Sequence, residues 1–327
     1  GYTTDKNAIC LDGECADLSE LLGIYEEKLE KVFKFNTEKI EKEIPSVDYK
    51  EKNVFVASAK VAKPKVLIPV FPGTNCEYDT SKAFLKAGAD PEIFVINNLS
   101  AKGIKDSVDA FADKVKSSQI VFIPGGFSGG DEPDGSGKFI TAFFRNEAIK
   151  DAVTELLEAR DGLMGGICNG FQALIKLGLV PYGKIIDTDE NCPTLSFNTI
   201  ARHQSKIVRT RVASNNSPWL SKTAVGDIYS VPISHGEGRF IASEELLKSL
   251  AENGQIITQY ADLEGNPTYD IQFNPNGSIW AVEGICSPDG RVIGKMGHSE
   301  RVGTHLYKNV EGNYDMGLFD SAVEYYK

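Results

Sequence analysis

The sequence predicts an α/β fold with a mostly parallel central sheet flanked by helices. Short continuous apolar runs, typical of strands buried on both faces, recur at residues 66–70, 93–96 and 120–123. Segments with the apolar spacing of helices alternate with these runs. Glycine-rich turns follow some of the runs, at the sheet edge where open α/β sheets bind ligands.

Composition excludes several classes of function. The 327 residues suffice for one large domain or two ordinary ones, and 35 basic against 46 acidic residues give a net charge of −11. This charge argues against nucleic acid or an anionic membrane as the main partner. The six cysteines, at positions 10, 15, 76, 168, 192 and 286, lack the paired spacing of a zinc site, and no long apolar run is present. We therefore expect reduced cysteines, no metal site and a cytoplasmic location.

Residues 1–64 differ in character from the rest. Asp17–Glu20 has capping-box chemistry, and an amphipathic helix is expected after it from apolar positions 18, 21, 22, 25, 29, 32 and 33. Residues 36–53 are rich in Lys and Glu, as in a solvated linker or an irregular strap over another domain. We expect 1–64 to be a helical and extended tail, the end of a preceding domain plus a connector, and 65–327 to be the main domain.

The main domain is expected to open with a strand at 66–70 and a turn at 72–75, where Asn75 can cap a helix over 78–87 that Gly88 ends. A strand at 93–96, a helix at 104–115, a strand at 120–123 and two helices within 137–160 follow. Beyond Gly178 the pattern changes to alternating strands around 207–212 and within 256–293, which we expect to extend or cap the sheet.

The loop at 124–131 contains four glycines, so its backbone can approach a ligand closely. A phosphate cradle is disfavoured because no Gly-Lys-Ser/Thr stands at P-loop spacing. Backbone amides that hold an oxyanion suit the loop better. A flexible surface loop is the alternative.

Cys168 lies where an apolar run, 163–164, meets a helix marked by Phe171, Leu174, Ile175 and Leu177. The adjoining glycines permit a sharp elbow, and a helix N-terminus favours a thiolate and a developing oxyanion. These features indicate a nucleophile elbow. The alternative is a buried structural cysteine in a glycine-rich turn.

A thiol nucleophile needs a base, and imidazole is the usual choice. The four histidines stand at 203, 235, 298 and 305, and two of them precede a glutamate by two residues, as His235-Gly-Glu237 and His298-Ser-Glu300. Residues i and i+2 of an extended segment point the same way, so either glutamate could orient its histidine. Spacing leaves the choice open, and either histidine could instead be a loop residue bonded to local backbone.

With these residues in place, the sequence resembles a class I (triad) glutamine amidotransferase, a flavodoxin-like fold. Residues 166–172 match the Gly-x-Cys-x-Gly-x-Gln elbow of that family, and a late His-x-Glu completes its triad. The segments 71–76, 125–128, 234–240 and 297–301 resemble, in order, the glutaminase part of phosphoribosylformylglycinamidine synthase. The resemblance covers roughly residues 65–305.

The resemblance implies that Cys168 is the nucleophile, His298 the acid/base and Glu300 its orienting carboxylate. It implies that amides around Gly126 and Phe127 and at Asn169 hold the oxyanion, and that Gln172 helps to position L-glutamine. His235, Glu237 and Ser128 are secondary candidates. Relatives usually carry proline where this chain has Ser299, and no glutamine contact is assigned to His203.

The resemblance further implies that ammonia passes to a synthetase domain that uses ATP and Mg²⁺ to convert formylglycinamide ribonucleotide (FGAR) to its amidine (FGAM), whereas the glutaminase needs no cofactor. Residues 1–64 resemble the end of that synthetase region, so we expect the C-terminal part of the long single-chain form. Rival hypotheses are a cysteine hydrolase or peptidase of the DJ-1/PfpI type and a silent glutamine-binding regulatory domain. His298-x-Glu300 and Gln172 argue against the first.

Overall fold

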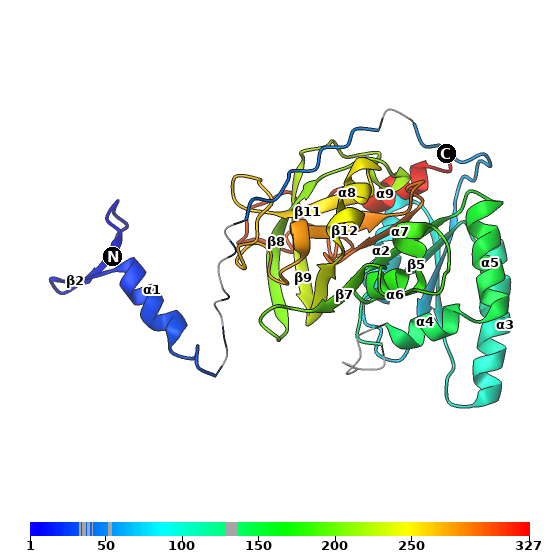
Figure 1. Cartoon of the computed structure of the whole chain (residues 1–327), viewed down its shortest axis with the longest axis horizontal. Coiled ribbons are helices and arrows are strands. Elements are labelled where there is room, and N and C mark those ends of the chain that lie inside the picture. Colours follow the sequence, from blue (N-terminus) through cyan, green and yellow to red (C-terminus); the bar gives the residue numbers. More distant parts are fainter. Residues whose placement is uncertain (33, 35–36, 38–39, 41, 52–53, 129–136) are drawn as a thin grey trace. The chain divides into compact units, whose positions relative to one another are not determined.

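The structure, a computed structural model, describes residues 1–327 except 33, 35–36, 38–39, 41, 52–53 and 129–136 (Figure 1). The chain divides into two compact units, Gly1–Ile40 and Glu41–Lys327. In the first unit, β1 (Ala8–Leu11) and β2 (Glu14–Asp17) form an antiparallel hairpin that leads into helix α1 (Leu18–Glu27). Asp17 caps α1 by accepting from the Ser19 amide at 2.8 Å, as predicted.

The hairpin pairs Cys10 with Cys15, and the two form a disulfide. The expectation that all six cysteines are reduced is therefore wrong for this pair, because the turn at Asp12 and Gly13 sets them directly opposite each other. Helix α1 ends earlier than its apolar spacing suggested and has no buried residue. The first unit thus presents apolar side chains to solvent: Leu18, Leu22, Tyr25 and Leu29.

The second unit is built on a nine-stranded sheet of order β4-β3-β5-β6-β13-β12-β11-β8-β9. The first five strands in this order run parallel, and each later pairing is antiparallel. The strands are β3 (Lys65–Val70), β4 (Asp90–Val95), β5 (Ile120–Ile123), β6 (Leu163–Ile167), β8 (Gln204–Val212), β9 (Ile228–His235), β11 (Ile256–Ala261), β12 (Val282–Cys286) and β13 (Val292–Lys295). A separate two-stranded sheet pairs β7 (Thr194–Phe197) with β10 (Glu237–Ile241).

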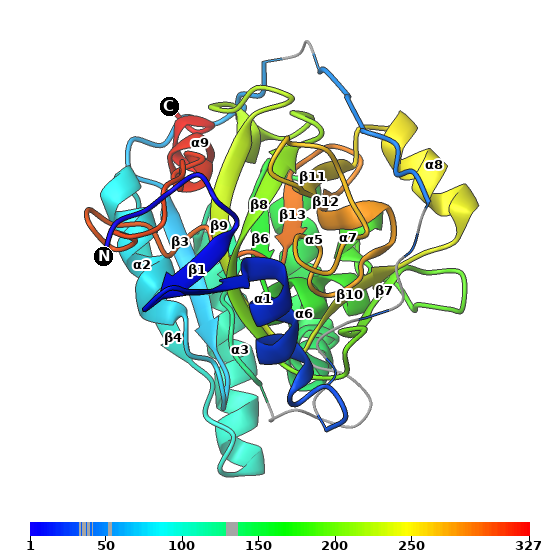
Figure 2. The ribbon, with the colours of Figure 1, turned by 90° about the vertical axis from the view of Figure 1, so that its left-hand side faces the viewer.

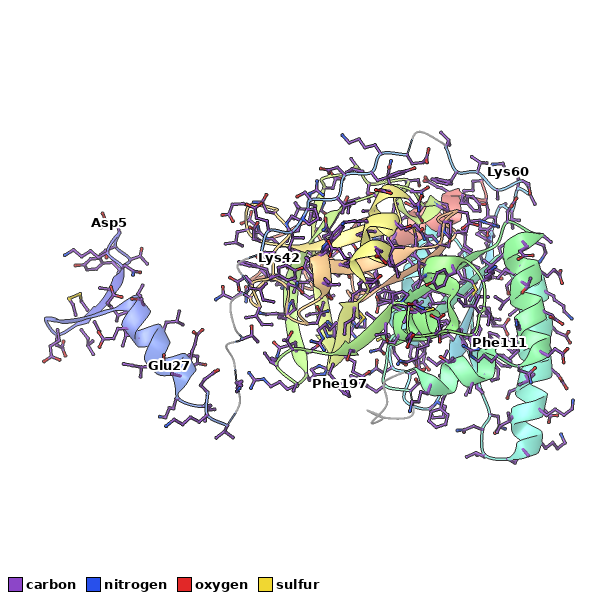
Figure 3. The ribbon with its side chains drawn as sticks, viewed as in Figure 1. Asp5, Glu27, Lys42, Lys60, Phe111 and Phe197 are labelled. Carbon is purple, nitrogen blue, oxygen red and sulfur yellow. A yellow bond between two sulfur atoms is a disulfide. The ribbon has the colours of Figure 1, made fainter. Side chains whose placement is uncertain are left out.

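Helices flank this sheet, and the aromatic residues of the core join them to it. Phe84 on one helix packs edge-on against Phe122 of β5 and Phe319 of the last helix. Phe111, labelled in Figure 3, packs against Phe143 and Phe144. The helices of this unit are α2 (Glu77–Ala87), α3 (Ala101–Ser117), α4 (Lys138–Phe144), α5 (Glu147–Glu158), α6 (Asn169–Leu177), α7 (Leu179–Tyr182), α8 (Glu244–Glu252) and α9 (Leu318–Glu324), with 3-10 turns η1 (Pro218–Leu220) and η2 (Ile279–Ala281).

The described residues between 42 and 64 belong to the second unit as an irregular strap, traced in Figure 2. Its backbone bonds to the residues that directly follow β8 and α9: the Tyr49 amide donates to Ala213 O at 2.9 Å and the Ala57 amide to Tyr325 O at 2.8 Å. Val47 and Ala57 are buried. The sequence pattern placed the start of the main domain at Lys65. The compact unit begins earlier, because it includes this strap.

The strand at 120–123 and the left-handed glycine that ends helix α2 agree with the prediction. Asn75 does not cap α2: Cys76 occupies the N-cap, and its thiol donates to the Asn75 side chain at 2.9 Å. The later strands do extend the main sheet, as expected. Within the described part of the chain, no helix is both long and apolar enough to cross a membrane.

Candidate active site

The register of two parallel strands brings together residues that are far apart in sequence. Ile167 of β6 pairs with Lys295 of β13, and the Cys168 amide donates to Lys295 O at 2.9 Å. Carboxyl ends of parallel strands lie at one edge of a sheet. The segment after β6 and the segment after β13 therefore meet there, and these carry Cys168 and His298.

Cys168 occupies a strained elbow between β6 and α6. Its φ of 55° and ψ of −108° are unusual for a residue with a side chain. Helix α6 starts at once, and Gly170 passes so close to β5 that a Cβ there would lie 2.0 Å from Ile123 O. This confirms the sequence's prediction of a tight strand-to-helix turn, and the thiol is buried at a helix N-terminus.

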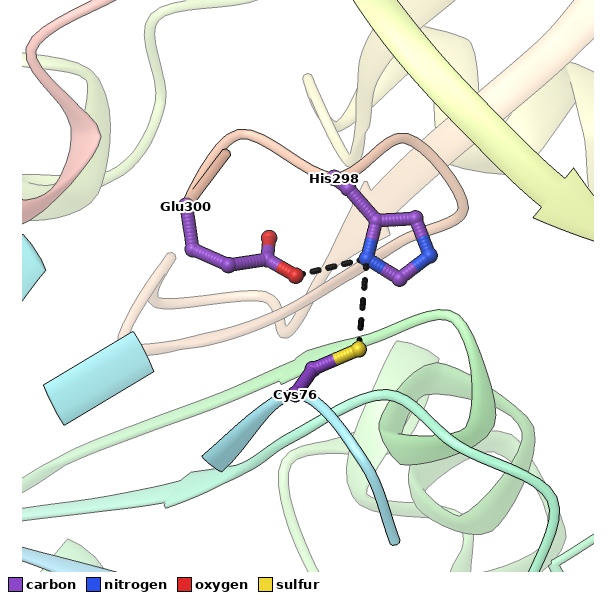
Figure 4. A group of neighbouring side chains, drawn as sticks. All are labelled: Cys76, His298 and Glu300. Atoms are coloured by element: carbon purple, nitrogen blue, oxygen red, sulfur yellow. Dashed lines mark hydrogen bonds and ion pairs between the residues drawn. The ribbon is translucent and has the colours of Figure 1, made fainter. Parts of the chain in front are cut away.

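His298 and Glu300 form a buried pair after β13. The ring Nδ1 lies 2.6 Å from the Glu300 Oε1 (Figure 4). Burial disfavours the charged ring, but the Glu300 carboxylate and the nearby thiols of Cys168 and Cys76 outweigh it and raise the pKa of His298 well above its usual value. Burial likewise opposes ionisation of Glu300, but the imidazolium lowers the pKa of this carboxyl. The pair is therefore ionic near neutral pH.

Cys168 and His298 meet around Gly125, in the loop after β5. A Cβ on Gly125 would lie 2.7 Å from His298 Cε1 and 3.4 Å from Cys168 Cβ, so a side chain here would block their approach. The Cys168 Sγ lies 3.7 Å from Ser234 O. The His298 Nε2 is buried without a hydrogen-bond partner in the described part of the chain. One ring nitrogen is thus held by Glu300, and the other is left for chemistry.

A second thiol, that of Cys76, lies beside the His298 ring. Its Sγ is 3.8 Å from His298 Nδ1 (Figure 4). The same Sγ is 3.1 Å from Arg301 Nη2. Sequence reasoning missed this proximity. The signal was available, because Cys76 follows β3 and so lies at the edge formed by the carboxyl ends of the parallel strands. Among the described residues, donor atoms of Cys76, His298 and Glu300 lie within 4.8 Å of one another. The adjacent guanidinium and the short Nδ1···Oε1 contact suit a proton better than a cation at this group.

The structure specifies which amides of the glycine-rich loop are available. The Phe127 amide donates to Gly73 O at 2.8 Å, whereas the amides of Gly126 and Asn169 have no hydrogen-bond acceptor in the described residues. Phe127 was expected to share in an oxyanion site, and its amide is occupied here. The Ser128 amide donates to the Asn169 Oδ1 at 3.2 Å. The buried hydroxyl of Ser128 has no hydrogen-bond partner in the described chain.

Gln172 is buried and bonded within the protein. Its Oε1 accepts from the Asn169 Nδ2 at 3.0 Å, and its Nε2 donates to Glu237 O at 2.8 Å. Its side chain therefore ties the start of α6 to the His235-Gly-Glu237 segment. That Gln172 contacts glutamine directly stays a prediction.

His235 lies buried at the end of β9, and its Nδ1 is 3.1 Å from the Asn198 Oδ1. Burial, together with the charges of His298 and His203, lowers the pKa of His235 to about 3. The exposed His203 lies at the same edge, with its Nε2 3.0 Å from the Ser234 hydroxyl and its ring 5.9 Å from that of Phe127. His235 is therefore neutral, unlike His298.

Comparison with known proteins gives the family and the fold of this chain. The family of CobB/CobQ-like glutamine amidotransferase domains matches residues 63–326. The phosphoribosylformylglycinamidine synthase subunit PurQ of Methanococcus maripaludis is 38% identical over 254 residues, which is 77% of this chain and 86% of that protein. PurQ of Aquifex aeolicus is 32% identical over 254 residues, 76% of this chain and 95% of that protein. A solved structure of PurLQS from Thermotoga maritima has the same fold, with a TM-score of 0.58 at 24% identity over 81% of this chain and 100% of that chain.

Proposed function

Since the chain belongs to the family of CobB/CobQ-like glutamine amidotransferase domains, and to that of the PurQ subunits of phosphoribosylformylglycinamidine synthase, we propose that it hydrolyses L-glutamine to supply ammonia for purine synthesis. The observation that carries the proposal is the meeting of Cys168, on its strained elbow, with the His298–Glu300 pair at the end of the neighbouring strand. This arrangement is that of a thiol nucleophile with an oriented base.

In the first step, the Cys168 thiolate attacks the carboxamide carbon of glutamine. The amides of Gly126 and Asn169, at the loop and at the start of α6, are the donors best placed for the oxyanion. The carbon–nitrogen bond then breaks, and the charged His298 ring gives its proton to the departing nitrogen, which leaves as ammonia. A glutamyl thioester remains on Cys168.

In the second step, the now neutral His298 takes a proton from water, and the resulting hydroxide attacks the thioester carbon. The carbon–sulfur bond breaks, glutamate leaves, and the thiolate and the charged imidazole are restored. Glu300 orients the ring and stabilises its charged form throughout. Gln172 would act by fixing Asn169, and Ser128, His235 and Glu237 by shaping the walls of the site.

We propose that the ammonia is used by a synthetase partner that converts FGAR to FGAM with ATP and Mg²⁺, whereas the glutaminase step needs neither. The similar Thermotoga maritima structure is one of PurLQS, and the matched relatives are PurQ subunits. These relatives are separate subunits, so the long single-chain form expected from the sequence is not the form that they show. We place the reaction in the cytoplasm, where a catalytic thiol stays reduced.

The test is alkylation by an electrophilic glutamine analogue, with the adduct mapped by mass spectrometry. We expect labelling at Cys168 that glutamine blocks, and loss of this labelling and of glutaminase activity in Cys168→Ser. The matched control is Cys76→Ser, which removes the other thiol of the pocket and should keep the Cys168 adduct. Glutamine-protected labelling of Cys76 instead would overturn the assignment.

A further inference from the structure

A second buried ion pair contacts the loop after β13 that carries His298. Glu283 of β12 and Lys295 of β13 lie on adjacent strands, and both side chains are fully buried. The Lys295 Nζ is 3.1 Å from the Glu283 Oε1. Taking two charges out of water is costly, and replacing such a pair by apolar residues is often neutral or stabilising. Stability alone is therefore a weak reason for this pair.

Both members of the pair also form hydrogen bonds with the loop that follows β13. The Lys295 Nζ donates to Gly297 O at 3.2 Å and to the Ser299 Oγ at 3.0 Å, so its three hydrogens have three acceptors. The Glu283 Oε1 also accepts from the Gly297 amide at 2.5 Å. Gly297 and Ser299 directly precede and follow His298.

The rest of the network fixes the pair itself. The Thr258 hydroxyl donates to the Glu283 Oε2, and the Met296 amide donates to Glu283 O at 3.1 Å. The Ser299 hydroxyl directs its own hydrogen toward the Met316 Sδ, 3.3 Å away. The loop is thus bonded to the sheet on both sides of His298. Movement of these side chains would leave a buried charge without its hydrogen bonds.

Ser299 occupies the position between the two members of the His298–Glu300 pair. Its hydroxyl accepts from Lys295. A hydrogen bond from a buried cation therefore holds the residue between His298 and Glu300.

We infer that Lys295 and Glu283 are positioning residues for the proposed glutaminase reaction, which hold Gly297 and Ser299 so that the His298 ring stays aligned between Glu300 and Cys168. This inference rests on the proposed function for its kinetic consequence. Its geometric part does not, because the reactivity of Cys168 toward a small alkylator can be measured without glutamine turnover.

The test compares Lys295→Met with the double variant Glu283→Gln/Lys295→Met in the full chain. The single change leaves Glu283 buried and unpaired and should lower the unfolding midpoint by roughly 5 to 10 °C. The double change removes both charges, and the carboxamide that replaces the carboxylate can still accept from the Gly297 amide, so the midpoint should largely recover. We expect kcat to stay about 10- to 100-fold below wild type in both variants, with KM for glutamine changed by less than about threefold.

The second readout is the pH profile of Cys168 alkylation by iodoacetamide, followed by mass spectrometry. If His298 is misaligned, the profile should shift in both variants relative to wild type. Lys206→Met, at a lysine of β8 that donates to Gln272 O and not to the loop, is the matched control and should keep the wild-type rate and profile.

A double variant with wild-type kcat and an unshifted alkylation profile would overturn the inference, and the pair would then serve stability alone. A wild-type chain that alkylates at Cys168 but does not hydrolyse glutamine would contradict the proposed function. The alkylation profiles of the two variants would still decide the role of the pair.

Discussion

Two segments of this protein share the spacing His-x-Glu and differ in almost every other respect. In 297–300, the ring of His298 is paired with Glu300 and its pKa is raised. In 234–237, His235 bonds to a neutral amide and its pKa falls to about 3. The spacing His-x-Glu alone therefore does not determine whether a histidine can act as a base. The hydrogen-bond partner of the ring nitrogen and the charges around the ring determine its pKa.

The cause of the difference is visible in the partner residues. The Asn198 Nδ2 donates to His235 O at 2.8 Å and to Arg202 O at 2.9 Å, so its Oδ1 must accept, and the His235 Nδ1 must carry a hydrogen. Glu237 starts β10, and its carbonyl accepts from Gln172. The second segment is thus bonded to helix α6 through Gln172, and the first carries the proposed acid and base.

The difference between the two segments is tested most directly by removing each imidazole in turn. His298→Ala should lower glutamine hydrolysis by about 10³- to 10⁴-fold, because both proton transfers lose their carrier. The measurement is glutamate release under saturating glutamine. His235→Ala is the matched variant and should retain measurable turnover, since its ring is neutral and bonded to Asn198. An inactive His235→Ala with an active His298→Ala would reverse the two assignments.

The carboxylates give the next largest contrast. Glu300→Gln keeps the shape of the side chain but removes the charge that raises the pKa of His298, and kcat should fall by about 10²-fold or more. The pH profile of Cys168 alkylation should shift at the same time. Glu237→Gln, which leaves the backbone carbonyl that binds Gln172 in place, should change kcat by less than about tenfold. Equal losses in the two variants would contradict the distinction between the segments.

The parts that sequence could predict are the local ones. The apolar run before Cys168, the glycines around it and the helix after it specify the elbow within a short segment. His298 reaches Cys168 only because β13, far later in the chain, inserts parallel beside β6. Such a register depends on packing of the whole sheet, and no short pattern encodes it. The resemblance, not the spacing, therefore chose His298 over His235.

The same limit explains what was missed. Cys76 and Arg301 were both within recognised segments, yet their contact at 3.1 Å joins the segment that follows β3 to the segment that follows β13. For Phe127, the sequence predicted a free amide that the structure does not show. Sequence showed a loop rich in glycine, but only the structure shows that the Phe127 amide is already bonded to Gly73 O.

The smallest expected effect concerns stability and not rate. Because the folded-state pKa of His235 is about 3 and the ordinary value is 6.5, the unfolded chain binds more protons between these two pH values. The contribution of His235 to stability is thus fully present above pH 6.5 and is lost progressively as pH falls toward 3. At about pH 5 the loss amounts to about 2 kcal/mol.

His235→Gln should remove this dependence, because its amide does not titrate. Denaturant unfolding at about pH 7.5 and about pH 5 should show a drop in the free energy of unfolding that is about 2 kcal/mol smaller in the variant than in wild type. The quantity compared is the drop between the two pH values in each protein, and not the absolute stability of either protein. Equal drops would mean that His235 is protonated in the folded chain, and the electrostatic contrast between the two His-x-Glu segments would then fail.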